Sequence, residues 1–248
     1  MKRMLIIIAA MLLGAGALLY LFRDPLKQAA YDRLTADMFV PADTDSFDPG
    51  PELGSDFPGV NALYRGRRIQ LINDFAGENG TVLIASRSLD WCPYCMRQMI
   101  QLQEHKPGFD RAGIGLVGIT YDEPRLQQVF IERHGITIPI LSDIDALTFK
   151  TLGILNETYS PGDLQYGIPH PGMMVIDPQG KDVGKLFLEA YSSRVDSSAA
   201  LAFARKVLGL DDPRVQPPLA RGPGPASNWF VGTYEMGEDQ ARSWTTGR

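Results

Sequence analysis

The two cysteines of the chain are separated by only two residues, and they lie at the junction of two predicted elements. Residues 81–86 form a short apolar run that is typical of a buried strand. Pro93 suits the first turn of a helix, and apolar residues continue at helical spacing as far as the break predicted at Pro107-Gly108. The order is therefore a strand, a tight turn that carries Cys92 and Cys95, and a helix.

This placement predicts a redox-active disulfide between Cys92 and Cys95. A cysteine just ahead of a helix faces unpaired backbone N–H groups and the positive end of the helix dipole, and both stabilise a thiolate. We expect Cys92 to be the attacking thiol and Cys95 to resolve the mixed disulfide that forms on it. The competing interpretation is a pair of inert core thiols or an incidental short disulfide.

The rest of the pattern predicts an α/β fold with one central mixed sheet and helices on both faces. A second buried strand is predicted over residues 114–120, followed by a helix over 124–134. The segments 173–176 and 182–188 flank a turn and indicate a hairpin, and a last helix is predicted over 196–208.

The N-terminal part predicts a transmembrane helix. Residues 4–22 form an uncharged run of nineteen, which is long enough to cross a hydrocarbon core of roughly 30 Å. Lys2 and Arg3 precede it, so the N-terminus is predicted in the cytoplasm and the body on the extracytoplasmic, periplasmic side. The alternative is a signal peptide that is cleaved after export to the periplasm, since Ala15 and Ala17 match a cleavage site.

Four regions follow from these patterns. Residues 1–23 are a membrane anchor or signal segment, 24–53 a linker, 54–209 the folded domain, and 210–248 a Pro/Gly-rich tail that is predicted to be disordered.

Charge and cysteine count exclude several classes of function. The formal net charge is −5, without an extended basic cluster, which argues against nucleic acid as a partner. Two cysteines cannot form a four-cysteine zinc site, and the three histidines are scattered along the chain. The sequence predicts no cofactor and no bound metal.

The segment Trp91-Cys92-Pro93-Tyr94-Cys95 resembles the active-site turn of thioredoxin-fold proteins. Its inner Pro93-Tyr94 is similar to that of glutaredoxins. Three further segments resemble parts of the alkyl hydroperoxide reductase/thiol-specific antioxidant family, the peroxiredoxin-like redoxins. They are residues 54–58, 67–73 and 138–143. The resemblance covers residues 54–209 and implies a thioredoxin-like fold.

The resemblance also implies supporting residues. Pro171 matches the proline before the third core strand, which is often cis in this superfamily and lies against the dithiol, with Pro169 as the alternative. His170 would then lie near the dithiol, where a cation favours the thiolate.

Some peroxiredoxin residues are missing. Positions seven and three before Cys92 hold Ala85 and Leu89 in place of the expected proline and threonine, and Pro171 replaces an expected arginine. Arg87 is a candidate substitute for that cation.

With these departures from the peroxiredoxin pattern, we consider three hypotheses for the function, in order of preference. The first is a membrane-anchored extracytoplasmic thiol-disulfide oxidoreductase that acts on protein thiols or disulfides, with an electron-donor protein still to be identified. The alternative is a peroxiredoxin-like thiol peroxidase, with Cys92 peroxidatic and Cys95 resolving. The third is a copper-binding thiol chaperone that uses the two thiolates and a histidine. The sequence does not decide whether the pair reduces or oxidises its substrate.

Overall fold

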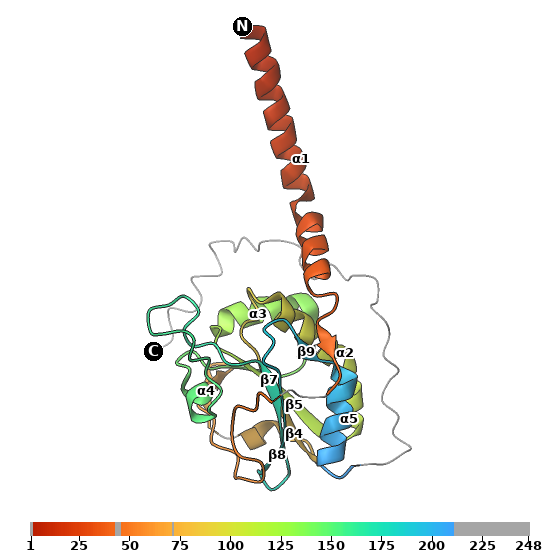
Figure 1. Ribbon diagram of the computed structural model, residues 1–248, viewed down its shortest axis with the longest axis vertical. Helices are drawn as coiled ribbons and strands as arrows, with labels where there is room; N and C mark the ends of the chain where they lie inside the picture. The colour runs from red at the N-terminus through yellow and green to blue at the C-terminus, as the bar shows by residue number, and fades with distance from the viewer. Residues whose placement is uncertain (1, 43–45, 71, 211–248) are drawn as a thin grey trace. The chain divides into compact units, whose positions relative to one another are not determined.

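The computed structural model describes residues 2–42, 46–70 and 72–210, and these residues fall into two parts (Figure 1). One part is helix α1 (Lys2–Leu34), which continues well past the predicted anchor over 1–23 and contains Pro25. In the described part of the chain, no helix is both long enough and apolar enough for a membrane span. The other part begins at Thr35. The predicted disordered tail lies outside the described residues except for Leu210.

The core of the second part is a mixed sheet of seven strands in the order β3-β2-β6-β5-β4-β7-β8. The strands are β2 (Ala62–Tyr64), β3 (Arg67–Ile69), β4 (Gly80–Ala85), β5 (Ile114–Thr120), β6 (Ile140–Ser142), β7 (Gly172–Ile176) and β8 (Asp182–Phe187). Strands β4, β5 and β6 are parallel, whereas β7 runs antiparallel to both β4 and β8. The hairpin predicted near the C-terminal end is therefore confirmed as β7 and β8.

Strand β4 lies inside the sheet, between β5 and β7, and every one of its residues is buried. Leu83 pairs with Val117 on one side and with Met174 on the other, so these three side chains share one face of the sheet. They belong to a core cluster that also contains Phe149, which is fully buried. A continuous apolar strand of this kind is expected where both faces of a sheet are covered.

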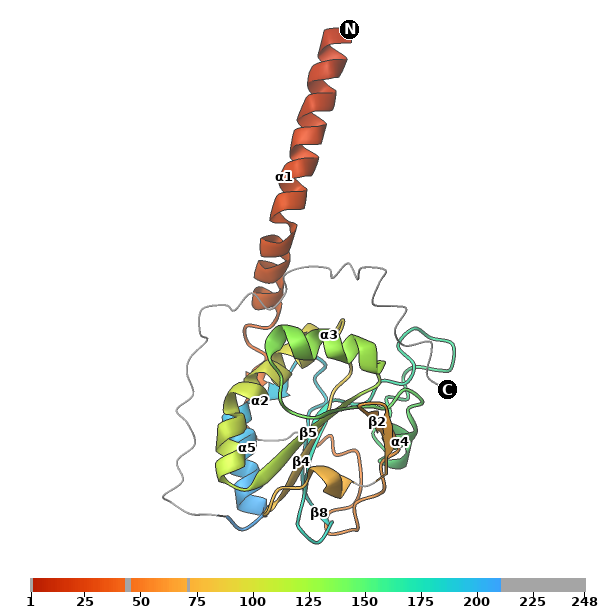
Figure 2. The ribbon, with the colours of Figure 1, turned by 180° about the vertical axis from the view of Figure 1, so that it is seen from behind.

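Four further helices cover the sheet in the described part of the chain. The helices are α2 (Pro93–Arg111), α3 (Pro124–His134), α4 (Leu147–Thr151) and α5 (Ser197–Val207), with a short 3-10 helix at Ile72–Phe75. Figures 1 and 2 show α2 and α5 side by side. Phe149 places α4 on the face of Leu83. On the opposite face, a β-carbon at Gly118 would lie 3.0 Å from Met99 of α2, and one at Gly184 would lie 2.8 Å from Phe203 of α5. Glycine at these two positions lets α2 and α5 approach the strands closely, and helices on both faces are confirmed.

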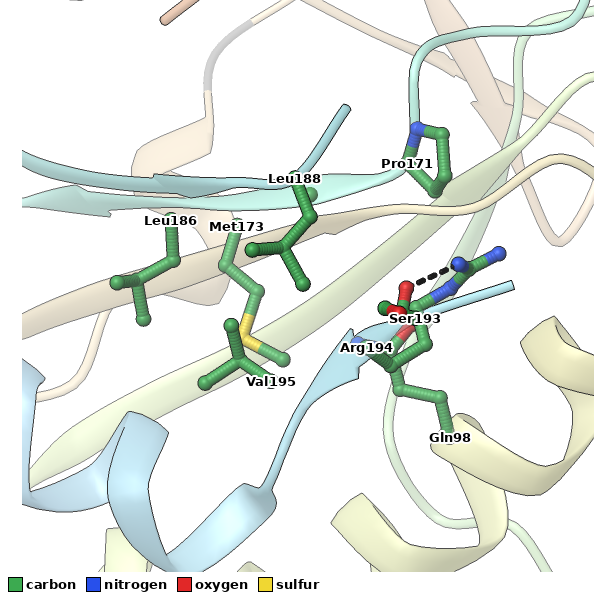
Figure 3. Close-up of a pocket in the computed structure, with 9 residues that line it drawn as sticks. Gln98, Pro171, Met173, Leu186, Leu188, Ser193, Arg194 and Val195 are labelled. Carbon is green, nitrogen blue, oxygen red and sulfur yellow. Dashed lines mark hydrogen bonds between the residues drawn. The ribbon is translucent and has the colours of Figure 1, made fainter. Parts of the chain in front are cut away.

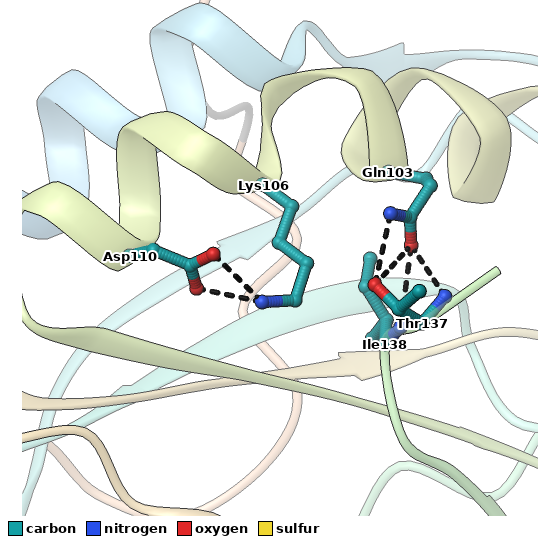
Figure 4. Close-up of polar contacts among 5 residues, drawn as sticks. All are labelled: Gln103, Lys106, Asp110, Thr137 and Ile138. Carbon is teal, nitrogen blue, oxygen red and sulfur yellow. Dashed lines mark hydrogen bonds and ion pairs between the residues drawn. The ribbon is translucent and has the colours of Figure 1, made fainter.

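The sequence predicted that the helix after the cysteine pair ends at Pro107-Gly108. Helix α2 instead runs one turn further, to Arg111. The last turn buries Phe109 completely, while Pro107 itself is exposed. Lys106 also forms an ion pair with Asp110 across this turn, with 2.7 Å between Nζ and Oδ1 (Figure 4). Burial of the aromatic ring therefore outweighs the lost backbone hydrogen bond of the proline.

Helix α2 is also held by Gln103, whose amide binds the segment that leads into β6 (Figure 4). Its Oε1 accepts hydrogen bonds from the backbone N–H groups of Thr137, at 2.8 Å, and Ile138, at 3.2 Å. Its Nε2 donates to Thr137 Oγ1 at 3.0 Å. These bonds fix the helix that begins at the cysteine pair.

A second, two-stranded parallel sheet lies partly within the predicted linker. Strand β1 (Phe39–Val40) pairs with β9 (Arg194–Val195), and the Arg194 N–H donates to the Met38 carbonyl at 2.7 Å. Met38 is only 3% exposed. Part of the segment predicted to be a spacer is thus ordered and packed in the domain.

The first residue of β8, Asp182, is a buried carboxyl. Its backbone N–H donates to the Ser55 carbonyl at 3.0 Å, and its carbonyl accepts from the Gly54 N–H at 2.6 Å. The side chain is 0% exposed, and its Oδ1 accepts from the Gly184 N–H at 3.2 Å while Oδ2 has no partner. Burial raises the pKa of Asp182 to about 7, against the opposing effects of the Gly184 hydrogen bond and Lys185.

Candidate active site

Cys92 is the N-cap residue of α2, as the motif predicted. Its backbone is extended, with φ −93° and ψ 101°, and Pro93 occupies the first helical position. The Cys95 N–H donates to Cys92 Sγ at 3.3 Å. The sulfur therefore occupies the place that a serine or aspartate oxygen takes at an ordinary N-cap, where donors and the helix dipole favour negative charge.

Cys92 and Cys95 form a disulfide, with their Cα atoms 5.3 Å apart. Both residues are 0% exposed. A small cluster covers them, consisting of buried Met38 and Tyr94 with partly buried Phe39 and Trp91. The disulfide thus lies beneath a hydrophobic cover rather than on an open surface.

A buried arginine contacts the second cysteine. Arg194 Nη2 donates to Cys95 Sγ at 3.4 Å, and Nη1 donates to the Tyr191 carbonyl at 3.2 Å. Arg194 is 2% exposed. Its burial, together with the nearby charge of Arg87, lowers the pKa of Arg194 to about 9. The guanidinium still carries most of its charge at neutral pH.

Arg87, the candidate substitute cation, is buried beside it at 1% exposure. Its Nη2 donates to the same Tyr191 carbonyl at 2.8 Å, and its guanidinium lies 3.5 Å from the centroid of the Tyr191 ring. Burial lowers the pKa of Arg87 as well. Across the described ranges, neither Arg87 nor Arg194 forms an ion pair with a carboxylate, and the Nε of each is buried without a partner.

The turn ahead of Cys92 is held in place by Asp122, which lies in the turn after β5. Its Oδ2 accepts from the Leu89 N–H at 2.7 Å and from Thr120 Oγ1 at 2.8 Å. The carboxyl is 4% exposed, and burial raises the pKa of Asp122 against these hydrogen bonds. Asp122 therefore positions the loop that leads into Cys92.

Trp91 and Tyr94, the predicted aromatic supports, belong to the cluster around the cysteines, and each of them contacts a tyrosine. Trp91 Nε1 donates to the Tyr121 hydroxyl at 2.9 Å, with the two rings edge to face. Tyr94 makes an edge-to-face contact with Tyr191, at 6.1 Å between centroids. These contacts fix the orientation of the turn that carries Cys92.

Pro171 lines a small pocket together with Arg194, between the β7-β8 hairpin, β9 and α2 (Figure 3). The other lining residues are Gln98, Gly172, Met173, Leu186, Leu188, Ser193 and Val195. The prediction of a cis bond before Pro171 is wrong, because the described residues contain no cis peptide bond. The next residue, Gly172, already pairs with Phe187 at the start of β7, so an extended trans backbone leads directly into the strand.

His170 packs its ring edge to face against Phe47, at 4.9 Å between centroids. Its backbone N–H donates to the Ile154 carbonyl at 2.7 Å. Burial lowers the pKa of His170, although the charge of Glu157 opposes this effect. A neutral imidazole does not supply the predicted cation, and the guanidinium of Arg194 takes that position beside the sulfur.

The copper hypothesis needs a histidine beside the two thiols. No group of three His, Cys, Asp or Glu side chains that could hold a metal occurs among the residues with described positions. His170 therefore does not complete a three-ligand site with Cys92 and Cys95.

Comparison with known proteins places this site in a family. Residues 54–181, about half of the chain, match the model of the AhpC/TSA family. The chain belongs to the AhpC/TSA family. The match includes Cys92, Cys95 and Pro171 but stops before Arg194, and it begins after Met38.

Individual AhpC/TSA relatives agree with this assignment. A relative from Mycobacterium tuberculosis that carries the name of a peroxiredoxin is 31% identical over 91 residues, which are 37% of this chain and 57% of the relative. Alkyl hydroperoxide reductase E of the same species is 23% identical over 128 residues, which are 52% of this chain and 80% of the enzyme. The chain thus matches less than two thirds of the first relative and four fifths of the second.

Solved structures of similar shape support the fold. The peroxidoxin BcpB of Mycobacterium tuberculosis has a TM-score of 0.51 at 20% identity and covers 67% of this chain and 99% of its own. Reduced Prx3 of Vibrio vulnificus has a TM-score of 0.54 at 18% identity and covers 62% of this chain and 99% of its own. Together with the strand order, they establish the thioredoxin-like fold that the sequence predicted.

Arg194 and Met38 are the site residues that sequence reasoning missed. Arg194 lies 99 positions after the cysteine it contacts, in a segment without periodicity. Met38 lies in a polar stretch that reads as a spacer. Arg194 comes directly before Val195 and the helix cap Asp196, and no strand pattern marks this position in the sequence.

Proposed function

We propose that the chain is a thiol peroxidase, in which a peroxide oxidises Cys92 and Cys95 resolves the product. The observation that carries this proposal is the Cys92–Cys95 disulfide at the N-terminus of α2 in a member of the AhpC/TSA family. The names of the relatives, alkyl hydroperoxide reductase and peroxiredoxin, support the peroxide as substrate. They favour it over the disulfide exchange that the sequence ranked first.

The chemistry takes two steps before an external reductant is needed. The Cys92 thiolate attacks the outer oxygen of the peroxide, the O–O bond breaks, and an alcohol or water leaves as Cys92 becomes a sulfenic acid. The Cys95 thiol then attacks the Cys92 sulfur and expels water, which leaves the disulfide. A thiol reductant returns both cysteines to the reduced state and is itself oxidised to a disulfide.

The burial of the dithiol favours a small oxidant. Cys92 is 0% exposed under Met38 and Trp91, so a folded protein reaches its sulfur only after the cover opens. A hydrogen peroxide molecule is close to water in size and requires a smaller opening. The same limit applies to the reductant, which reaches the disulfide only when the cover opens.

A second candidate function is thiol-disulfide exchange with proteins, which the sequence ranked first. The observation in its favour is the absence of the peroxiredoxin proline and threonine, because Ala85 and Leu89 stand at those positions. Leu89 contributes only its backbone N–H to the site, through Asp122. Peroxide activation would then depend on the helix N-terminus and the buried arginines.

One experiment separates the two functions. Reduced protein is mixed with a slight excess of hydrogen peroxide, and the loss of peroxide and the formation of the disulfide are followed by stopped-flow fluorescence and mass spectrometry. Wild type should consume one peroxide per dithiol within seconds, Cys92→Ser should consume none, and Cys95→Ser should stop at a sulfenic acid that dimedone traps. The same reduced protein is offered a disulfide-bonded protein such as insulin. Insulin reduction without peroxide consumption would replace the peroxidase proposal with the second candidate.

For the location, we propose that the N-terminus lies in the cytoplasm and the domain outside it, in the periplasm, with a secreted form after cleavage as the alternative. The support is the uncharged run over residues 4–22 after Lys2 and Arg3. Reporter fusions after residue 53 measure the side of the membrane, and carbonate extraction measures whether the chain is anchored. An active cytoplasmic reporter in the soluble fraction would contradict both forms.

A further inference from the structure

We propose that Arg194 is a catalytic residue that stabilises Cys95 as the thiolate leaving group when the Cys92–Cys95 disulfide is reduced. The inference rests on the redox cycle of the proposed function, but it concerns the reductive half of that cycle, which both candidate functions share. It assigns the two cysteines different sources of stabilisation. Cys92 uses the helix N-terminus, and Cys95 uses the guanidinium.

The geometry separates these two sources. Cys92 Sγ occupies the N-cap position and accepts the Cys95 N–H. Cys95 lies within the first turn of α2, where its own N–H is already used in that bond. Arg194 Nη2 reaches Cys95 Sγ at 3.4 Å. The second sulfur therefore has a charged donor of its own from β9.

The local charge balance points in the same direction. Arg87 and Arg194 are both at most 2% exposed, and both donate to the carbonyl of Tyr191. Within the described residues they have no carboxylate partner, and the other groups facing Arg194 are the phenols of Tyr94 and Tyr191. Buried charge without a counter-charge is unfavourable. The disulfide is neutral. When it opens, a negative charge forms on a sulfur near the guanidinium groups of Arg87 and Arg194, which have no other counter-charge among the described residues.

The step balances as an ordinary thiol-disulfide exchange. A reductant thiolate attacks Cys92 Sγ, a new S–S bond forms, and the Cys92–Cys95 bond breaks. The electron pair of that bond moves to Cys95 Sγ, which leaves as a thiolate next to Arg194. A second reductant thiol attacks the mixed disulfide and releases Cys92, so two reductant thiols become one disulfide. A leaving thiol of lower pKa leaves faster, and stabilising the reduced form raises the reduction potential of the couple.

The first test titrates Cys95 alone, in a Cys92→Ser variant, by the absorbance of the thiolate near 240 nm. With Arg194 present, the midpoint should lie below that of a free thiol, which is about 8.5. A midpoint at or above the free-thiol value overturns the proposal without any change at Arg194, so this measurement does not depend on the folding of an arginine variant.

The second test replaces the arginine. Arg194→Gln in the same background should raise the Cys95 midpoint by at least one pH unit, and Arg194→Lys should restore at least half of the difference. In the otherwise wild-type chain, Arg194→Gln should slow reduction of the disulfide by dithiothreitol at least tenfold and lower its reduction potential. Arg111→Gln, at the exposed far end of α2, is the matched control and should change neither.

These readouts are independent of the peroxidase proposal. Absence of peroxide consumption with a low Cys95 midpoint would reject the proposed function and keep this inference. Normal peroxide consumption with a Cys95 midpoint that Arg194→Gln does not move would reject this inference and keep the proposed function.

Discussion

Replacing Asp182 with asparagine should stabilise the domain, and the gain should depend on pH. Burial raises the pKa of this carboxyl from 3.8 to about 7 in the folded chain. A carboxyl with a raised folded-state pKa contributes stability below its unfolded pKa, and this contribution is lost as pH rises through the folded value. A difference of about three pH units corresponds to about 4 kcal/mol at ~1.36 kcal/mol per unit, which is an upper limit because local relaxation reduces it.

Asparagine keeps the side-chain oxygen that accepts the Gly184 N–H, and it does not ionise. The unfolding free energy of Asp182→Asn minus that of wild type should therefore be near zero at pH 4. It should rise between pH 4 and pH 7 and level off above pH 8 at about 2 to 4 kcal/mol. Urea unfolding curves followed by circular dichroism from pH 4 to pH 9 measure this difference.

The control is Asp74→Asn, which changes an exposed carboxyl in the short 3-10 helix. Taking the difference between each variant and wild type at each pH removes the contributions of all other titrating groups. A difference for Asp182→Asn that stays constant from pH 4 to pH 9 would refute the reasoning, because it would mean that the carboxyl ionises equally easily in the folded and unfolded chain.

Two further substitutions test the packing around the dithiol by urea unfolding. Asp122→Ala removes the acceptor of the buried Leu89 N–H and should cost about 2 to 3 kcal/mol, with a loss below 0.5 kcal/mol arguing against its role in the loop. Gly118→Ala places a methyl group 2.7 Å from Ile140 Cδ1 and 3.0 Å from Met99 Cε, and should cost about 1 to 3 kcal/mol, whereas an unchanged midpoint would show that α2 can shift freely.

The sequence predicted the sheet and its helices well where local signals were strong. The apolar runs predicted β4 and β5, and Pro124 and Gly135 predicted the two ends of α3 at Pro124–His134. Pro107 was read as a helix end, yet α2 continues through it because Phe109 is buried in the next turn. A local signal failed there because tertiary packing determined the boundary.

The chemical core of the site was also predictable, but its surroundings were not. Cys92 and Cys95 are neighbours in sequence, so their spacing next to a helix start was enough to predict the pair. Arg194 reaches Cys95 through a strand pairing between segments more than 150 positions apart, β1 and β9. Such a contact leaves no periodic trace in a single sequence, and His170 was assigned the positive charge in its place.

The pairing of β1 with β9 has a practical consequence for protein production. A clone that starts at residue 54, where the family match begins, would lack Met38 and Phe39. Its cysteines would lose part of their hydrophobic cover, and Arg194 would lose the backbone partner that its N–H now uses. Rates measured on such a fragment would describe a disulfide with less cover than in the full chain, so recombinant forms intended for kinetics should begin no later than Thr35.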